Sequence, residues 1–304
     1  RRYRVIRLGE GGIRSVDVVP VESRNINHTH LGFIDPARSP ESYKVGLDLR
    51  LVSDVMFDDD GKLYRKVINA KTGKEEYVDV EKLASSVVMF PGEKGPRVRA
   101  LVRGKELDLV QAKSVDYILP APSSIFSLNS RLVPMVSTIK PGRLMMIAKY
   151  FTQALPLKSA ETPLVQSAED SDPNRSIEES IAKHLGAVVA KSSGVVREVR
   201  KNKIIVETND GKRMAYPLYK DFILNRASYI SNIPVVKAGD IVQPGTVLAK
   251  SNFTDDKGCM ALGVNLKTAY IPWKGMNYED AIVVSESAAK KLAAERMYMK
   301  AFDT

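Results

Sequence analysis

The sequence predicts a mixed fold that is rich in β-structure and contains few helices. Short runs of β-branched and alternating residues, bounded by glycine, proline and aspartate, fill residues 51–117 and 186–249. Longer helical spacing occurs only at residues 140–156. The chain has 304 residues, of which 44% are hydrophobic and 27% charged, so it has enough apolar surface for packed cores and suggests more than one domain.

Residues 1–50 are rich in turns. Gly9-Glu10-Gly11-Gly12 predicts a glycine loop, and Pro36 and Pro40 interrupt a stretch in which neither helical nor strand spacing persists. A segment of this length without regular spacing is unusual inside a compact domain, and it is more often functional or supported by other subunits. We therefore expect an ordered loop region as the first domain.

Residues 51–117 predict a small antiparallel β module, with strand-like runs at residues 62–67, 76–80 and 97–102 separated by turns. The run Asp58-Asp59-Asp60-Gly61 is the most tempting metal motif, because clustered carboxylates bind Mg²⁺ or Ca²⁺. An EF-hand loop would also need a ligating glutamate further along, whereas the chain continues into a predicted strand. A hairpin turn is therefore the favoured interpretation.

Residues 118–185 predict a connecting segment that is largely helical. A helix should begin at Pro141 and stop at Pro156, and its apolar residues on more than one face call for neighbours on several sides. Ser176 and Glu179 have the spacing of a capping box, which predicts a short second helix that ends at Gly186.

Residues 186–270 predict a barrel-like all-β unit of strands and turns. Within it, residues 235–249 have a form that also occurs in barrel-sandwich carrier domains for biotin or lipoate. A carrier must display a modifiable lysine on a tight exposed hairpin, and none stands at the expected turn. A structural barrel-sandwich-like unit is therefore favoured, and a carrier domain is the weakest alternative.

Charge and rare residues limit the function classes. The 46 Lys and Arg against 36 Asp and Glu give a net charge of +10, which suits an anionic partner such as nucleic acid but does not by itself require one. The single cysteine, Cys259, excludes an internal disulfide framework and a cysteine-based zinc site. His28 and His30 lack a third ligand nearby and predict structural hydrogen bonds, and His184 predicts a capping or surface residue.

Neither a membrane segment nor a signal peptide is evident. No apolar run approaches the ~20 residues that a bilayer-spanning helix needs, and the start Arg1-Arg2-Tyr3-Arg4 lacks the apolar stretch of a signal peptide. We expect no membrane partner and an intracellular location.

The strongest functional signal is the string at residues 271–286, Ile-Pro-Trp-Lys-Gly-Met-Asn-Tyr-Glu-Asp-Ala-Ile-Val-Val-Ser-Glu. Glu279 and Asp280 follow a glycine-containing turn and directly precede a strand-like run at residues 281–284. Adjacent side chains of a strand point to opposite sides, so at most one of the two could face a given ligand directly. The alternative is a solvated acidic turn without function.

This string resembles the hallmark of the β subunit of bacterial-type multisubunit DNA-dependent RNA polymerases. Further similar stretches follow in that family's order at residues 9–12, 30–47, 115–134, 143–165 and 254–263. The resemblance covers essentially the whole chain, but only the middle of a full β subunit. It implies that residues 1–50 are the fork-loop region of the catalytic core, that residues 118–185 bind the RNA–DNA hybrid, and that residues 271–304 begin a double-psi β-barrel.

The resemblance also implies a function. The chain would be part of a DNA-directed RNA polymerase, a nucleotidyltransferase, and would be inactive alone. Glu279 and Asp280 would help to position a second, triphosphate-bound Mg²⁺, partly through water, while a β′ subunit holds the main catalytic Mg²⁺. Arg143 would contact the incoming triphosphate. The arginines of the fork segment would contact nucleic acid; they are Arg4, Arg7 and Arg14.

The implied partners are a β′-like subunit, the remaining β segments, template DNA, RNA product and nucleoside triphosphates. Three departures from the family pattern stand out: residues 38–44 replace its Glu-Thr-Pro-Glu-Gly-Pro-Asn, Gly142 replaces an asparagine, and residues 150–153 replace Met-Gln-Arg-Gln. Such divergence resembles the split polymerases of giant bacteriophages, so we expect the cytoplasm of a bacterial or phage-infected cell, or a virion. The alternative is a non-catalytic nucleic-acid-binding or assembly protein that retains the fold.

Overall fold

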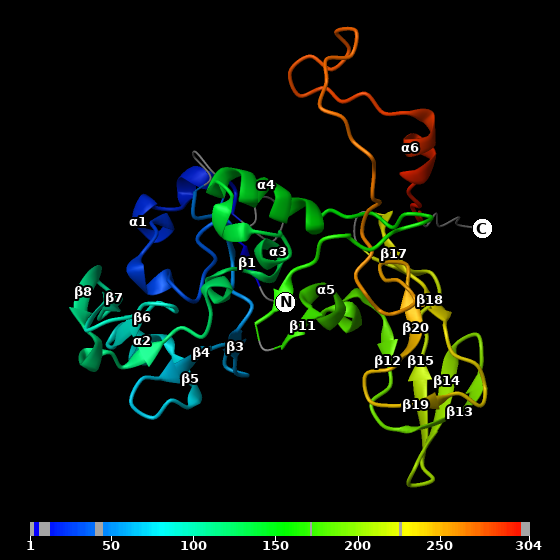
Figure 1. Ribbon diagram of the computed structural model, residues 1–304, viewed down its shortest axis with the longest axis horizontal. Coiled ribbons are helices and arrows are strands. Elements are labelled where there is room, and N and C mark those ends of the chain that lie inside the picture. The colour runs from blue at the N-terminus through cyan, green and yellow to red at the C-terminus, as the bar shows by residue number, and fades with distance from the viewer. Residues whose placement is uncertain (1–2, 6–12, 40–44, 171, 225–226, 299–304) are drawn as a thin grey trace. The chain divides into compact units, whose positions relative to one another are not determined.

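The structure, a computed structural model, describes residues 3–5, 13–39, 45–170, 172–224 and 227–298. The chain divides into two compact units, residues 1–152 and residues 153–304 (Figure 1). Several sheets and a few short helices make up the fold, as the sequence predicted for its class. Among the described residues, no helix is both long and apolar enough to span a lipid bilayer.

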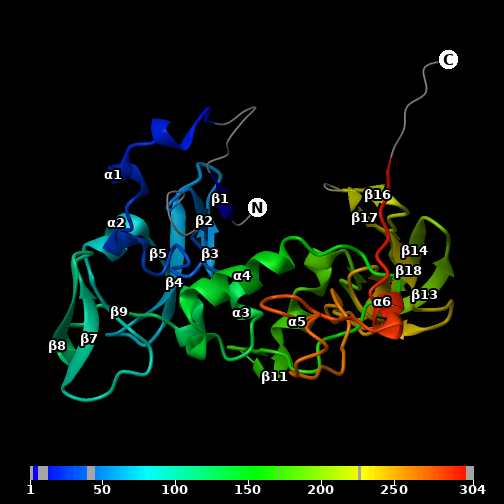
Figure 2. The same ribbon diagram turned by 90° about the horizontal axis from the view of Figure 1, so that it is seen from above.

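The first unit is built on one sheet with the strand order β3-β4-β9-β6-β7-β8, to which β5 is added beside β4 (Figure 2). Its strands are β3 (Val55–Phe57), β4 (Leu63–Asn69), β5 (Glu75–Asp79), β6 (Val87–Met89), β7 (Arg97–Val102), β8 (Glu106–Gln111) and β9 (Tyr117–Ile118). The strand runs predicted at residues 62–67, 76–80 and 97–102 are therefore confirmed to within a few residues. Only β6 and β9 run parallel to each other in this sheet.

The acidic run Asp58-Asp59-Asp60-Gly61 forms the hairpin turn between β3 and β4, as predicted. The Gly61 N–H donates to the Asp58 carbonyl oxygen at 3.0 Å, and the Lys62 N–H donates to the Asp58 side chain at 2.8 Å. Gly61 has a φ of +81°, which a glycine adopts without strain.

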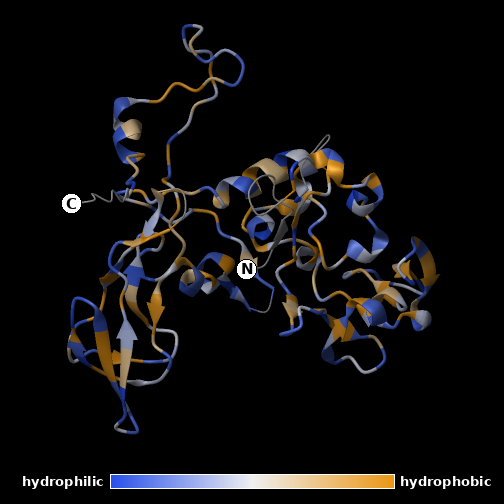
Figure 3. Cartoon of the chain, turned by 180° about the vertical axis from the view of Figure 1, so that it is seen from behind, coloured by the Kyte–Doolittle hydropathy of each residue, from blue (hydrophilic) through white to orange (hydrophobic). Residues whose placement is uncertain are grey.

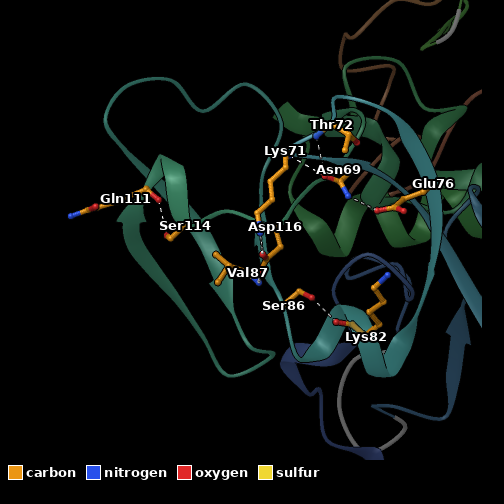
Figure 4. A network of polar contacts seen from close by, with 10 residues as sticks. All are labelled: Asn69, Lys71, Thr72, Glu76, Lys82, Ser86, Val87, Gln111, Ser114 and Asp116. Atoms are coloured by element: carbon orange, nitrogen blue, oxygen red, sulfur yellow. Dashed lines mark hydrogen bonds and ion pairs between the residues drawn. The ribbon is translucent and has the colours of Figure 1, made fainter.

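Asn69 and Asp116 hold the next turn and join it to the rest of the sheet (Figure 4). The Asn69 side-chain oxygen accepts the N–H groups of Lys71 and Thr72. Asp116 accepts the Val87 N–H of β6 at 3.0 Å, and one of its oxygens lies 3.8 Å from the Lys71 ammonium. These contacts connect the β4–β5 turn with β6 and β9, which are distant in sequence.

The core of the first unit combines buried aliphatic side chains with a buried polar cluster. Its central apolar residues are Phe33, Leu51, Val52, Val55, Val67, Val78, Leu83, Val88, Leu101, Tyr117 and Leu119. In β4, alternation places Arg65 on the same inner face as Val67, and both are fully buried. Full burial of a valine side chain stabilises a fold by ~1.5–3 kcal/mol, whereas a buried guanidinium needs an anionic or carbonyl partner.

The Asp54 carboxylate supplies the negative charge beside two buried guanidinium groups, those of Arg65 and Arg131. Arg65 donates through Nη2 to the Ser124 carbonyl oxygen at 2.7 Å, and its Nη1 lies 3.9 Å from Asp54 Oδ2. Arg131 Nη1 lies 3.6 Å from Asp54 Oδ1 and donates to the Ser53 hydroxyl at 2.7 Å. Burial lowers the pKa of Arg65 to about 10, so this side chain is still protonated at neutral pH.

The remaining elements of the first unit are short, apart from one helix. They are β1 (Tyr3–Val5), η1 (Val16–Val18), α1 (Val21–Arg24), η2 (His28–His30), β2 (Asp48–Arg50), α2 (Val80–Ala84), η4 (Ala112–Ser114), η5 (Pro122–Ile125), α3 (Leu128–Arg131), η6 (Val136–Thr138) and α4 (Pro141–Phe151). The predicted strand at residues 76–80 ends one residue early because Asp79 accepts the Lys82 N–H and starts α2.

Helix α4 begins at Pro141, as predicted, but it ends at Phe151 rather than at Pro156. The Thr152 hydroxyl donates to the Lys149 carbonyl oxygen at 2.6 Å, so a side chain satisfies a carbonyl that a longer helix would pair with a backbone N–H. The helix packs through Leu144 and Ala148, which are buried. Met146, Ile147 and Tyr150 are exposed, while Met145 and Phe151 are half-buried. The chain therefore covers the helix mainly on one face, where the sequence predicted neighbours on several sides.

The second unit begins with the predicted capping box. The Ser176 hydroxyl accepts the Glu179 N–H, and Glu179 accepts the Ser176 N–H. The helical segment consists of α5 (Ile177–Ser180) and η7 (Ala182–Leu185), and it ends at Gly186, whose φ is +89°. This confirms both predicted ends of the segment.

Two small sheets follow, with the orders β12-β20-β18 and β15-β14-β13-β19. The strands of this unit are β10 (Ala168–Glu169), β11 (Asp172–Ser176), β12 (Val188–Val189), β13 (Gly194–Val199), β14 (Lys203–Thr208), β15 (Arg213–Pro217), β16 (Phe222–Ile223), β17 (Tyr229–Ile230), β18 (Asn232–Pro234), β19 (Ile241–Val242) and β20 (Val247–Ser251). The predicted succession of strands and turns over residues 186–249 is confirmed.

The two sheets share one apolar core that includes Val196, Ile204, Val206 and Leu248. Gly194 has a steric role at the start of β13, because a Cβ placed there would lie 2.2 Å from the Glu207 carbonyl oxygen. Only glycine permits this close approach of β13 to β14.

Candidate active-site residues

The acidic pair predicted from the sequence lies in a long excursion of the second unit, between the β-rich core and α6 (Glu286–Lys291) (Figure 1). Its first turn is held by Asn277. The Asn277 side-chain oxygen accepts the Trp273 N–H at 2.8 Å, and its amide nitrogen donates to the Ile271 carbonyl oxygen at 2.6 Å. The Met276 N–H also donates to the Trp273 carbonyl oxygen at 2.8 Å, with Gly275 at a φ of +72° between them.

Glu279 and Asp280 occupy a second turn directly after the first. The Ala281 N–H donates to the Tyr278 carbonyl oxygen at 3.3 Å, and Glu279 has a φ of +57°. A residue other than glycine in this left-handed region is strained by ~1–2 kcal/mol, and such strain is often found at functional sites. Both carboxylates are exposed, and within the described part of the chain neither has a hydrogen-bond or ion-pair partner.

The strand expected at residues 281–284 is not observed, so that prediction is wrong. Ile282 is 84% exposed, Val283 46% and Val284 50%, and hydrophobic colour marks the arm of the excursion that leads into α6 (Figure 3). A strand needs a neighbouring strand for its backbone groups, and the described residues supply none here. Glu279 and Asp280 both lie in a turn, so the alternation of strand side chains between two faces does not separate them.

Three polar residues clamp the base of the excursion. Lys291 Nζ lies 2.6 Å from a Glu161 carboxylate oxygen, and the other Glu161 oxygen accepts the Asn265 N–H at 2.8 Å. Lys291 also donates to the Asn265 carbonyl oxygen at 2.9 Å. The hydrogen bond from Lys291 contributes most to lowering the pKa of Glu161, followed by the hydrogen bond from the Asn265 backbone.

This clamp joins the outgoing and returning arms of the excursion to the segment that follows α4. Sequence reasoning missed it, because Glu161 lies more than a hundred positions before Asn265 and Lys291 and the three residues share no motif. The clamp does not contact Glu279 or Asp280 in any hydrogen bond, so its role is to hold the ends of the loop that carries them.

Arg143 lies in the first turn of α4 and is exposed, with Nη1 3.8 Å from the Met146 sulfur. It belongs to the first unit, whereas Glu279 and Asp280 belong to the second. That the three side chains meet at one nucleoside triphosphate remains a prediction.

The predicted nucleic-acid contacts lie near the N-terminus. Arg14 is exposed, and Arg4 lies in β1, where it pairs with Leu49 of β2. Arg7 and the glycine loop at residues 9–12 lie outside the described residues.

The other candidate side chains have structural surroundings. The Asn27 N–H donates to His30 Nδ1 at 3.4 Å, as expected for structural hydrogen bonding, and burial lowers the pKa of His30. His184 is exposed in the last turn of η7, as predicted. Cys259 is buried beside the Gln166 amide, and burial raises the pKa of its thiol to about 11.

The side chains of the candidate site fit a shared Mg²⁺ site but do not complete one. Across the described ranges, no group of three or more His, Cys, Asp or Glu side chains is placed to hold a metal ion. Mg²⁺ keeps several waters and often takes only one or two protein carboxylates, which two adjacent, exposed and unpaired carboxylates fit. Glu279 and Asp280 could therefore contribute to a shared, water-rich site but not form a complete one.

Comparison with known proteins adds independent evidence. Residues 189–304 match the family described as RNA polymerase Rpb2, domain 6. Proteins named DNA-directed RNA polymerase subunit beta align with nearly the whole chain: that of Rubrobacter xylanophilus is 31% identical over 99% of this chain and 27% of its own length, and that of Acetivibrio thermocellus is 31% identical over 95% and 24%. The protein of that name from Thermus thermophilus is 30% identical over 100% of this chain and 28% of its own length. The chain thus spans about a quarter of the length of these relatives.

Proposed function

The chain belongs to the β-subunit family of bacterial-type DNA-directed RNA polymerases, of which it represents one segment, and we propose that it completes an active site for template-directed nucleotidyl transfer together with a β′-like subunit. The observation that carries this proposal is the turn in which Glu279 and Asp280 present two exposed carboxylates that lack partners among the described residues. By itself the chain is inactive, because it holds only part of the site.

Nucleotidyl transfer depends on positioning and on neutralising the charge of the triphosphate. Mg²⁺ would supply that neutralisation, with the main ion on β′ and a second ion on the triphosphate. Glu279 and Asp280 would help to hold this second ion, partly through its water ligands. Arg143 donates to phosphate oxygens through its planar guanidinium fork, which suits bidentate contacts.

The finer organisation is part of the same proposal. Residues 1–50 form the fork-loop region, in which Arg4, Arg7 and Arg14 contact nucleic acid. Residues 51–117 form the β module, residues 118–185 the hybrid-binding segment and residues 186–270 the barrel-sandwich-like unit.

Residues 271–304 begin a double-psi β-barrel, and the strong exposure of Ile282, Val283 and Val284 supports their burial by other polymerase segments. The partners are the remaining β segments, template DNA, RNA product and nucleoside triphosphates. The site of action is the cytoplasm of a bacterial cell, or a bacterium infected by a phage that carries a split β subunit.

The test uses the complete polymerase, assembled from this chain, its β′-like partner and the remaining subunits. Replacing Glu279→Ala and Asp280→Ala together should slow single-nucleotide addition by roughly 10²–10³-fold, the usual loss when preorganised charge stabilisation is removed. Rapid-quench measurement at several Mg²⁺ concentrations should show partial recovery at high Mg²⁺. The control is Glu286→Ala, which removes an exposed carboxylate that pairs with Lys290 on α6. An unchanged rate for the double variant would disprove the assignment.

The three departures from the family pattern, including Gly142 next to Arg143 and residues 150–153 at the end of the same helix, favour a second candidate function. In that case the chain is a non-catalytic nucleic-acid-binding or assembly protein that retains the fold. Purification with a β′-like partner that carries the metal-binding aspartates supports the catalytic role. A partner that lacks them supports the assembly role.

A further inference from the structure

The free edge of the large sheet in the first unit has the features of a docking strand. β8 is the last strand of the sheet, and within the described residues it pairs only with β7 (Figures 1 and 2). Its apolar side chains are not covered, since Leu107 is 57% exposed and Leu109 49% exposed. The Leu109 N–H donates to the Asp108 side chain at 2.7 Å, a contact that an added strand would replace. An exposed edge with aliphatic side chains is a ready template for another strand.

One face of the β7–β8 hairpin is both apolar and positively charged. Arg97 and Arg99 alternate on β7, and Arg99 lies directly opposite Leu109 of β8, so these side chains share a face. Both arginines are exposed, and neither guanidinium has a hydrogen-bond or ion-pair partner among residues 45–170 or the other described ranges. The acidic residues of β8, Glu106 and Asp108, alternate onto the opposite face.

An apolar cavity of about 300 Å³ opens beside Leu107. Its apolar lining comes from the sheet and from the segment around η2, and includes Ile26, Leu31, Ile34, Phe90 and Leu101. A residue of an added strand opposite Leu107 would point to the same face as Leu107, within about 5 Å of it, and so could place its side chain at this cavity.

We propose that β8 binds an extended peptide segment of a partner protein as an additional antiparallel strand, and that alternate residues of this segment, which share one face, are two acidic residues followed by an aliphatic one. The backbone of β8 provides the hydrogen bonds of the pairing, Leu107 and the cavity receive an aliphatic side chain, and Arg97 and Arg99 pair with the acidic side chains. Single-stranded nucleic acid fits less well, because it stacks on aromatic side chains and this face presents leucines. The proposal is independent of the catalytic role, since it involves none of the candidate active-site residues.

The probe is a short labelled peptide in which glutamate, glutamate and valine occupy successive alternate positions with threonine between them, titrated against the full chain by fluorescence anisotropy. Binding should weaken by at least about tenfold in the variant Arg97→Glu/Arg99→Glu, and the same change of net charge at Lys201→Glu/Lys212→Glu, in exposed turns of the second unit, should leave it unchanged. Leu107→Ser should weaken binding without changing its salt dependence.

Peptide variants distinguish strand pairing from charge attraction without altering the protein. Methylation of alternate peptide nitrogens removes the hydrogen bonds of one edge and keeps the charge, so it should abolish binding. Equal binding of the methylated peptide would overturn strand addition. Absence of binding by the unmodified peptide, or an oligonucleotide that binds more tightly in a manner dependent on Arg97 and Arg99, would overturn the proposal as well.

Discussion

Replacing Asp54 should strongly reduce the stability of the first unit even when the shape of the side chain is kept. Asp54→Asn keeps the size of the side chain but removes the negative charge beside Arg65 and Arg131, leaving two cations in the interior. Breaking a fully buried ion pair costs about 3–5 kcal/mol. Asp54 is 27% exposed and lies 3.6 and 3.9 Å from the guanidinium nitrogens, so solvent screening and long contacts reduce the expected loss to ~2–3 kcal/mol.

Hydrogen-exchange mass spectrometry of the full chain can measure this loss. A destabilisation of ~2–3 kcal/mol raises the opening equilibrium constant by roughly 30- to 160-fold, so exchange should accelerate by that factor in peptides that cover β4 and residues 124–131. Peptides that cover β13 and β14 of the second unit serve as an internal reference. Asp59→Asn, in the exposed β3–β4 turn, is the matched control. If Asp54→Asn exchanges no faster than Asp59→Asn, then Asp54 does not neutralise the buried arginines.

Three further predictions concern the second unit. Because the pKa of Glu161 is lowered, its ion pair is fully present above pH 4.5, the ordinary pKa value, and is lost as the pH falls through the lower folded value. The fluorescence of Trp273, the chain's single tryptophan, should therefore change in acid. In the variant Glu161→Gln it should already be changed at neutral pH. Gly194→Ala should destabilise the pairing of β13 with β14 by ~1–3 kcal/mol through overpacking, so the amide hydrogens of these strands should exchange faster. Gly263→Ala should have no such effect, because a Cβ there meets no atom within 4 Å. Cys259, with a pKa of about 11, should react with iodoacetamide at neutral pH on the order of a hundredfold more slowly than free cysteine and at the normal rate in denaturant.

Local signals in the sequence predicted the elements that depend on local contacts. The hairpin at residues 58–61 and the capping box at Ser176 each close within a few residues, so turn and cap chemistry was sufficient to place them. The end of α4 was missed because a hydroxyl contact at Thr152 competes with the next turn of helix, an effect that apolar spacing does not reveal. The parallel pairing of β6 with β9 is non-local and has no signal in either strand.

The same contrast between local features and contacts of distant segments holds for the candidate site. Its two carboxylates were proposed from one string of residues, because adjacent carboxylates after a glycine turn are visible in the sequence. Its support was not, because the Glu161, Asn265 and Lys291 clamp comes from three separate segments. The strand predicted after Asp280 failed for a related reason: residues 281–284 have strand-like composition, but the described residues supply no strand to pair with them.

The excursion that carries Glu279 therefore lacks much of what would hold it in place. Its turns rest on the two side-chain hydrogen bonds of Asn277 and on the backbone bonds of Met276 and Ala281, while a left-handed glutamate opposes them by ~1–2 kcal/mol. Its aliphatic side chains bury little area, so hydrophobic packing contributes little to offset that strain. A turn of this kind gains rigidity when its exposed residues are covered. In the proposed polymerase, assembly with the neighbouring segments would then fix the acidic pair in position, which explains why the chemistry would require the complex even though this chain carries the carboxylates.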